Sequence, residues 1–184
     1  MALIEITEAD PRWPGEFEAV ASALDDALGA LAVRIDHIGS TAVPGLAAKD
    51  IIDVQVTVDS FGEDVVDALV TAGFSHQTHI TNDLLTGCDD PAELRKFLFR
   101  ERSGERRANI HVRQAGRANQ RYALLFRDHL RADDVVRDAY AELKRVLARE
   151  YPDDADGYYD VKDPAMDIIY RGAEHWAAAT GWTL

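Results

Sequence analysis

Hydrophobic residues recur at helical spacing near the start of the chain and again throughout its last third. Residues 13–31 place apolar side chains such as Phe17 and Leu24 on one face, and Gly29 predicts where that helix ends. The same periodicity occurs in residues 121–130, 134–151 and 163–180. Asp163 is the expected N-cap of the last helix, with Pro164 in its first turn. The final third is therefore predicted to be helical.

Shorter β-rich stretches lie between these helical segments. They predict a mixed sheet with strands at about residues 33–38, 51–58, 74–80, 95–101 and 106–113. Residues 51–58 are almost continuously apolar and β-branched, which is typical of a central strand, and a helix over residues 61–73 follows it. The last two strands flank Ser-Gly-Glu, which favours a hairpin. The pattern predicts one α+β domain, with a sheet-containing core over about 1–115, a helical part over about 116–184, and a shared hydrophobic core.

Composition narrows the possible partners. The 184 residues are 47% hydrophobic and 29% charged, as in a folded soluble protein, and the net charge of −13 would repel a nucleic-acid backbone. A polyanionic ligand would therefore need a local basic pocket. Cys88 is the single cysteine, no signal-peptide pattern opens the sequence, and no long apolar run is present. We expect a cytoplasmic protein with no membrane partner; its oligomeric state is not predicted.

A Gly-Ser turn follows the first predicted strand, in the segment HIGSTAVPGL. Gly39 would let the backbone approach a ligand closely, and the hydroxyls of Ser40 and Thr41 could bind phosphate oxygens. His37 could hydrogen-bond this turn when neutral or contact phosphate when protonated. The segment is neither a Walker loop nor a nucleophile elbow, so a simple turn is the alternative.

Asp53 lies in the middle of the buried-looking strand IIDVQV. A carboxylate there is costly unless it is paired or binds a cation. Because strand side chains alternate, Asp53 and Gln55 point to the same face, where ligands of a divalent metal could sit.

The segment HIGSTAVPGLAAKDIIDVQVTV resembles the hallmark of the GrpB family, whose fold is of the nucleotidyltransferase type related to the polymerase β superfamily. The likeness continues in order along most of the chain. It includes the segments PRWPGEFEAVASALDDALG, NIHVR, LLFRDHLR, AYAELKRVLA, YYDVKDPAMDII and AEHW. The resemblance implies a nucleotidyltransferase-type mixed sheet with packed helices.

The superfamily pattern places a Gly-Ser turn before an acidic pair, with a third acidic residue on a later strand. Gly39, Ser40 and Asp53 match it, whereas Gln55 and His111 stand where the second and third carboxylates belong. This set makes a poor magnesium cage and suits one softer ion, manganese or zinc, better. Mg²⁺ or Mn²⁺ is nevertheless the cofactor that the resemblance implies, with Asp53, Gln55 and His111 as its catalytic and metal-binding set. Two further residues are candidate replacement carboxylates, or else solvated or capping side chains: Asp36 and Asp50.

Several basic residues could complete a phosphate site. Lys49 precedes the Asp53 strand, where it could reach a phosphate or remain on the surface. Four more basic residues lie in helical segments that resemble the family, and surface salt bridging is their alternative role. These are Arg127, Arg131, Lys144 and Lys162.

These features predict a protein that binds a nucleotide or a phosphorylated small molecule, with transfer of a nucleotidyl group as a possible reaction. In that reaction Asp53 would hold the metal, Ser40 the terminal phosphates, and His111 could act as general base. The alternative is a binding or regulatory module that has lost turnover, and Gln55 is the feature in its favour. A purely structural interaction protein is a third hypothesis.

Overall fold

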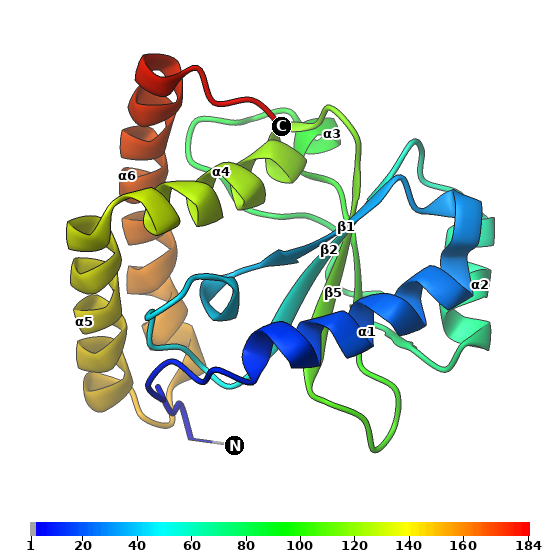
Figure 1. Cartoon of the computed structure of the whole chain (residues 1–184), viewed down its shortest axis with the longest axis horizontal. Coiled ribbons are helices and arrows are strands. Elements are labelled where there is room, and N and C mark those ends of the chain that lie inside the picture. The colour runs from blue at the N-terminus through cyan, green and yellow to red at the C-terminus, as the bar shows by residue number, and fades with distance from the viewer. Residues whose placement is uncertain (1–2) are drawn as a thin grey trace.

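A five-stranded mixed sheet forms the centre of the molecule in the computed structural model, which describes residues 3–184 (Figure 1). The strand order is β1-β2-β5-β4-β3; β2 and β5 are parallel, and the other neighbouring pairs are antiparallel. The strands are β1 (Arg34–Ile38), β2 (Ile52–Val58), β3 (Ser75–His76), β4 (Phe97–Arg100) and β5 (Ala108–Gln114).

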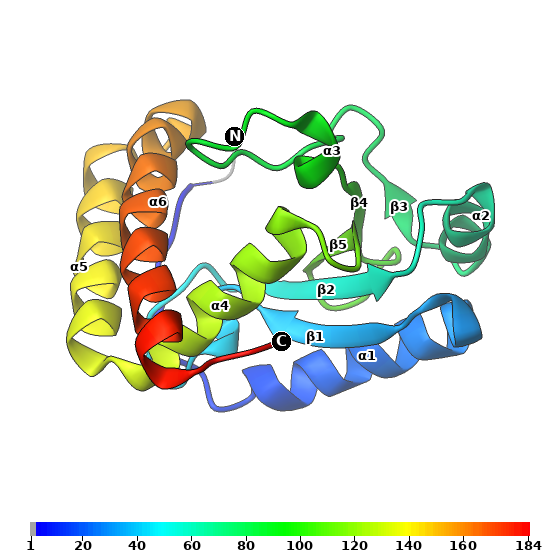
Figure 2. The same cartoon turned by 90° about the horizontal axis from the view of Figure 1, so that it is seen from above.

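Alternation along β2 gives the sheet two different faces. Ile52, Val54 and Val56 are fully buried in a sheet cluster that packs against α1 (Trp13–Leu28) and α2 (Glu63–Thr71). Asp53 and Gln55 therefore belong to the opposite face, as the period of two requires. Figure 2 shows α1 along one side of β1 and β2, and α4 (Ala118–Ala132) across the other.

The C-terminal third is helical, as predicted. After the short α3 (Pro91–Leu94), helices α4, α5 (Asp134–Glu150) and α6 (Ala155–Thr180) pack around a second group of buried residues, the helix cluster, which includes Leu125, Leu130 and Ala173. The buried apolar residues thus form two clusters instead of the expected shared core. None of the helices between residues 3 and 184 combines the length and the apolar character needed to cross a membrane.

The first turn of α6 corrects a sequence prediction. Asp154, and not Asp163, caps this helix, because its carboxylate accepts a hydrogen bond from the backbone N–H of Gly157. Pro164 consequently lies inside the helix, where it leaves the carbonyl of Asp160 without its usual backbone partner.

One strand boundary also differs from the prediction. The strand expected over residues 74–80 is only Ser75–His76, because the chain turns at Gln77, whose carbonyl accepts a hydrogen bond from the N–H of Ile80. Helix α1 ends at Leu28 with Gly29 as its C-cap, as predicted, and a 3₁₀ turn, η1 (Gly29–Leu31), follows it. The hairpin between β4 and β5 is present, and Gly104 in its turn has a φ of +82°.

Candidate ligand-binding site

A cavity of about 730 Å³ lies between the open face of the sheet and the C-terminal helices. Its walls come from the turn after β1, from β2 and β5, from the loop of residues 82–86, and from α4, α5 and α6. It therefore lies on the face of the sheet opposite the sheet cluster, and residues of the helix cluster such as Phe126 and Tyr140 also line it. Of the residues predicted as site residues, eight line it: Gly39, Ser40, Thr41, Lys49, Asp53, His111, Lys144 and Lys162.

Gly39, which follows β1, is packed against Asp53 of β2. Gly39 has a φ of +68°, and a Cβ added to it would lie 2.8 Å from the Cβ of Asp53 and still closer to a carboxylate oxygen. Glycine is thus required both for the backbone conformation and for the space. The Asp53 side chain is 27% exposed, and its Oδ1 accepts a hydrogen bond of 2.7 Å from the Asn109 amide. Within residues 3–184, Oδ2 accepts no hydrogen bond, so it is available to a ligand.

His111 faces Asp53 as a neutral imidazole. Burial lowers the pKa of His111 below its usual value. The guanidinium of Arg113 lies 3.4 Å from Nδ1 of His111, and because arginine only donates hydrogen bonds, the imidazole proton belongs on Nε2. That atom lies 3.9 Å from Oδ1 of Asp53. Burial raises the pKa of Asp53, but His111, Asn109 and Lys162 together outweigh burial and keep this pKa below its usual value.

Lys144 and Ser40 meet at the Gly-Ser turn after β1. The Lys144 ammonium donates a hydrogen bond of 2.8 Å to Ser40 Oγ and another to the carbonyl of Ala47. Lys144 is only 2% exposed, and no carboxylate between residues 3 and 184 lies within ion-pair distance of it. Burial, followed by the charges of Lys162 and Arg145, lowers the pKa of Lys144 to about 7.

Two more lysines line the same side of the cavity. The Lys49 ammonium donates to the Tyr159 hydroxyl at 3.2 Å and lies 4.1 Å from the centre of the Tyr158 ring. Lys162 pairs with Asp163 at 3.0 Å. Burial opposes the charge of Lys162, but Tyr140 and Asp163 outweigh burial and raise the pKa of Lys162. Lys162 is therefore cationic at neutral pH.

A charged cluster around Asp83 forms another wall and was missed in the sequence. Asp83 accepts hydrogen bonds from Lys96 at 2.6 Å, from Arg113 at 2.8 and 3.0 Å, and from Asn119 at 3.0 Å. Burial raises the pKa of Asp83, but Arg113 and Lys96 outweigh burial and keep this pKa well below its usual value. Asp83 lies in an irregular loop, so no local pattern marks it. The alternation of β5 does place Arg113 on the face of His111, and this signal was available.

Gln55, predicted as a metal ligand, does not line the cavity. It is fully buried, its Oε1 accepts a hydrogen bond of 2.7 Å from Arg113, and its Nε2 donates to the carbonyl of Gln120 at 3.2 Å. Alternation put Gln55 on the expected face, but both of its polar atoms already have protein partners.

Three residues predicted to bind phosphate support the turn from behind instead. The His37 ring stacks on Phe17, its Nε2 lies 3.0 Å from the Thr41 hydroxyl, and burial lowers its pKa to about 4. Arg127 donates to the carbonyl of His37, and Arg131 donates to the carbonyl of Ala42. These contacts hold β1 and its turn against α4, outside the residues that line the cavity.

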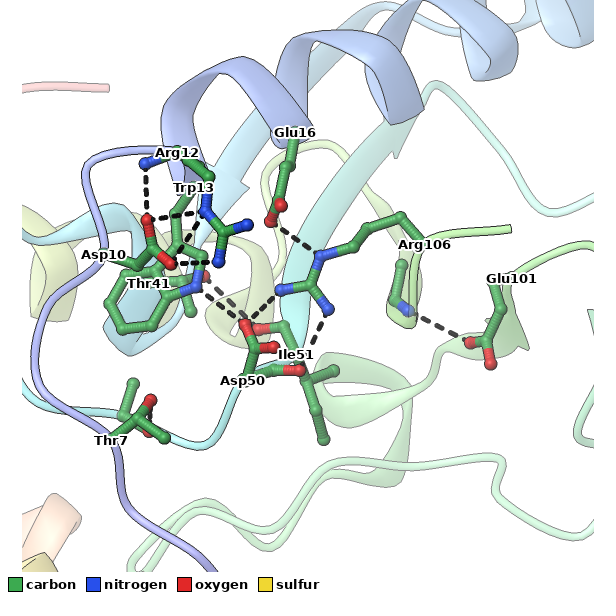
Figure 3. A network of polar contacts seen from close by, with 12 residues as sticks. Thr7, Asp10, Arg12, Trp13, Glu16, Thr41, Asp50, Ile51, Glu101 and Arg106 are labelled. Carbon is green, nitrogen blue, oxygen red and sulfur yellow. Dashed lines mark hydrogen bonds and ion pairs between the residues drawn. The ribbon is translucent and has the colours of Figure 1, made fainter. Parts of the chain in front are cut away.

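Neither candidate replacement carboxylate lines the cavity. Asp36, expected to be solvated or capping, is buried and ion-paired with Arg34 at 2.7 Å. Asp50 accepts a hydrogen bond of 2.8 Å from the Trp13 indole and also pairs with Arg106, as Figure 3 shows. Arg106 in turn joins Asp50 to Glu16 on α1. Asp50 therefore belongs to a structural network.

The residues present do not fit the metal site that the resemblance implies. Residues 3–184 contain no group of three or more His, Cys, Asp or Glu side chains placed to hold a metal ion. Asp53 offers a free carboxylate oxygen, but Arg113 engages both Gln55 and His111. Two-metal phosphoryl transfer needs several anionic ligands, and these residues do not supply them for Mg²⁺ or Mn²⁺.

The mixed sheet, the Gly-Ser turn beside Asp53 and the helical C-terminal part together define an α+β fold. Residues 3–171 match the family described as GrpB protein, and the chain belongs to this family. The crystal structure of GrpB from Enterococcus faecalis matches with a TM-score of 0.74 and 30% identity, over 94% of this chain and 99% of that one.

Related sequences include proteins of two sizes. The UPF0157 protein SCO7215 of Streptomyces coelicolor is 37% identical over 168 residues, which cover 90% of this chain and 82% of the relative. A protein named dephospho-CoA kinase, from Mycolicibacterium paratuberculosis, is 37% identical over 199 residues, which cover 98% of this chain and 48% of the relative. The chain thus spans about half the length of this kinase and of the other curated kinases it matches.

Proposed function

We propose that the cavity binds a nucleotide or a phosphorylated small molecule. The observation that carries this proposal is the contact between Lys144 and Ser40. A buried ammonium with no carboxylate nearby is unfavourable by itself, and an anionic ligand would offset its desolvation. The phosphate group would contact Lys144, the Ser40 hydroxyl and the backbone beside Gly39.

The remaining walls favour a ligand that is larger than phosphate. A cavity of about 730 Å³ is within the range of small-molecule sites, and it has aromatic walls that include Tyr122, Tyr140 and Tyr158. The free oxygen of Asp53 can accept a hydrogen bond from a hydroxyl group of the ligand, such as a sugar hydroxyl. Lys49 supplies a second cation for an extended or multiply charged phosphate.

A panel of ligands tests the proposal on the whole chain. Thermal shift and calorimetry would compare nucleoside mono-, di- and triphosphates, sugar phosphates, pyrophosphate and dephospho-CoA. Dephospho-CoA belongs in the panel because of the name of the relatives, although this chain spans only about half of their length. We expect at least one phosphorylated ligand to bind wild type and to bind much more weakly to Lys144→Met. No binding by any member of the panel would refute the proposal.

The control variant should remove a positive charge from α5, the helix that contains Lys144, at a residue that does not line the cavity. Arg149→Met meets this need, because Arg149 lies in α5 with 67% of its side chain exposed. Pyrophosphate release from nucleoside triphosphates should be measured in parallel. Release that disappears in Asp53→Ala would support an enzyme, whereas binding without release would support a binding module.

A further inference from the structure

Strand β5 presents three polar side chains to the cavity, and none of them is acidic. In the parallel pairing with β2, Asn109 lies beside Asp53, His111 beside Gln55, and Arg113 beside Thr57. Asn109, His111 and Arg113 all line the cavity. The strand that should supply a third carboxylate thus supplies an amide, an imidazole and a guanidinium.

The guanidinium of Arg113 lies between the two groups that would have to join Asp53 around a cation. It donates to Oε1 of Gln55 at 2.7 Å and lies 3.4 Å from Nδ1 of His111. Its side chain is 7% exposed, so little water screens its charge. Arginine also stays protonated throughout the pH range of folded proteins. A divalent cation bound among these side chains would therefore be repelled by a fixed positive charge.

Asp83 keeps this charge in place. Its carboxylate accepts two hydrogen bonds from Arg113 and one from Lys96, and the Lys96 side chain is only 9% exposed. Two cations share this one carboxylate, so the cluster keeps a net positive charge at the cavity wall. A phosphate group needs positive charge around it, and here the protein supplies that charge itself.

We propose that Arg113, held by Asp83, takes the electrostatic place of the divalent metal, so that the cavity binds its phosphorylated ligand without a metal ion. The inference rests on the proposed function and adds that Lys144, Lys96 and Arg113 supply the charge. The neighbouring Asp53 then serves as a hydrogen-bond acceptor for the ligand. Mg²⁺ is not required for binding.

Calorimetry with pyrophosphate as the probe tests this directly. The full chain is titrated once in EDTA and once in excess Mg²⁺, and we expect binding in EDTA to be at least as tight as binding with Mg²⁺. Affinity about tenfold or more weaker in EDTA would overturn the inference while leaving the proposed function intact. If pyrophosphate binds under neither condition, the inference fails as well, and the ligand panel then decides the proposed function separately.

A second measurement needs no phosphate ligand. Mn²⁺ is titrated into wild type and into Asp53→Asn, and free Mn²⁺ is followed by electron paramagnetic resonance. We expect identical weak binding by the two proteins, as the acidic surface alone would produce. A stoichiometric Mn²⁺ site that is present in wild type and lost in Asp53→Asn would overturn the inference. Because Asp53→Asn changes a single polar atom next to Asn109, it is expected to stay folded, and circular dichroism would check this.

Discussion

The ammonium of Lys144 on α5 lies 2.8 Å from the hydroxyl of Ser40 on the turn after β1, and this contact joins the helical part to the sheet. Lys144→Met keeps most of the buried stem and removes the charge. We expect it to weaken binding of the phosphorylated ligand by roughly 30-fold, since a hydrogen bond to a charged group contributes about 2 kcal/mol. Calorimetry on Lys144→Met and on the control Arg149→Met measures the effect. Equal affinities of the two variants for the ligand would show that Lys144 does not contribute to binding.

The depressed pKa of Lys144 predicts how stability depends on pH. The native pKa is about 7, against 10.5 for an ordinary lysine, so between these values the unfolded chain binds more protons than the native state. The contribution of Lys144 to the free energy of unfolding therefore rises from about pH 7 to 10.5, is complete above 10.5, and is lost as the pH falls back to about 7. Other groups that face the Lys144 ammonium also influence its pKa, namely Tyr140, Lys162, Arg145 and Asp53. These four residues are the same in wild type and in Lys144→Met.

Urea unfolding of wild type and Lys144→Met over this pH range measures that contribution. The stability of wild type relative to the variant should increase with pH. Two curves that remain parallel would show that Lys144 keeps an ordinary pKa in the folded protein.

Gly39 should be much less tolerant of substitution than Gly104, another glycine with a positive φ. Gly39→Ala combines an unfavourable φ of +68° with a clash against Asp53, whereas Gly104 has a φ of +82° and open space around its Cα. We expect Gly104→Ala to cost about 1 to 2 kcal/mol for the backbone alone. Gly39→Ala should cost more, and it should also displace Asp53 and weaken ligand binding. Urea unfolding of the two variants separates the cost of the backbone conformation from the cost of the clash with Asp53. Equal losses of unfolding free energy would show that the contact with Asp53 adds nothing.

The parts of the site that could be predicted from the sequence are those fixed by local rules. Alternation along β2 put Asp53 on the face away from α1, and a glycine after a strand predicted the turn that meets it. The same alternation put Gln55 on that face, but it could not show that Arg113 and the carbonyl of Gln120 occupy both ends of the amide. A period of two gives the face of a strand and says nothing about what covers it.

The parts that could not be predicted depend on contacts between distant segments. Asp83 meets Lys96, Arg113 and Asn119 only because an irregular loop brings it to the wall of the cavity. The start of α6 shows the same limit, because both Asp154 and Asp163 have the residue type of an N-cap. Only the folded chain shows that Asp154 caps the helix and that Pro164 is accommodated inside it.

The network in Figure 3 predicts that Asp50 stabilises the fold without contributing to binding. Asp50→Ala would leave the indole N–H of Trp13, a residue only 2% exposed, without its acceptor, which costs about 1 to 3 kcal/mol. Asp50→Asn keeps an acceptor oxygen and should cost less. Urea unfolding gives the stability, and calorimetry with the phosphorylated ligand should show unchanged affinity for both variants. A loss of affinity in Asp50→Asn would show that the Asp50 carboxylate does contribute to ligand binding.

Asp83 should be among the carboxylates on which stability depends most. Asp83→Ala leaves Lys96 and Arg113 buried without a carboxylate, and breaking such a buried pair costs about 3 to 5 kcal/mol. Asp89→Ala, in the same loop but exposed, should cost almost nothing. Lys96→Met combined with Asp83→Ala removes one of the two stranded charges, so the double variant should lose less stability than the sum of the single variants.

Because the pKa of Asp83 lies below its usual value, the stability difference between wild type and Asp83→Ala should depend on pH. The carboxylate is ionised in the native state and protonated more readily in the unfolded chain, whose ordinary pKa is 3.8. The stability that Asp83 contributes is therefore complete above pH 3.8 and is lost as the pH falls below it. Wild type should approach Asp83→Ala in stability as acid is added, whereas Asp89→Ala should follow wild type throughout. A stability difference between wild type and Asp83→Ala that does not shrink in acid would contradict the ion pairs of Asp83 with Lys96 and Arg113.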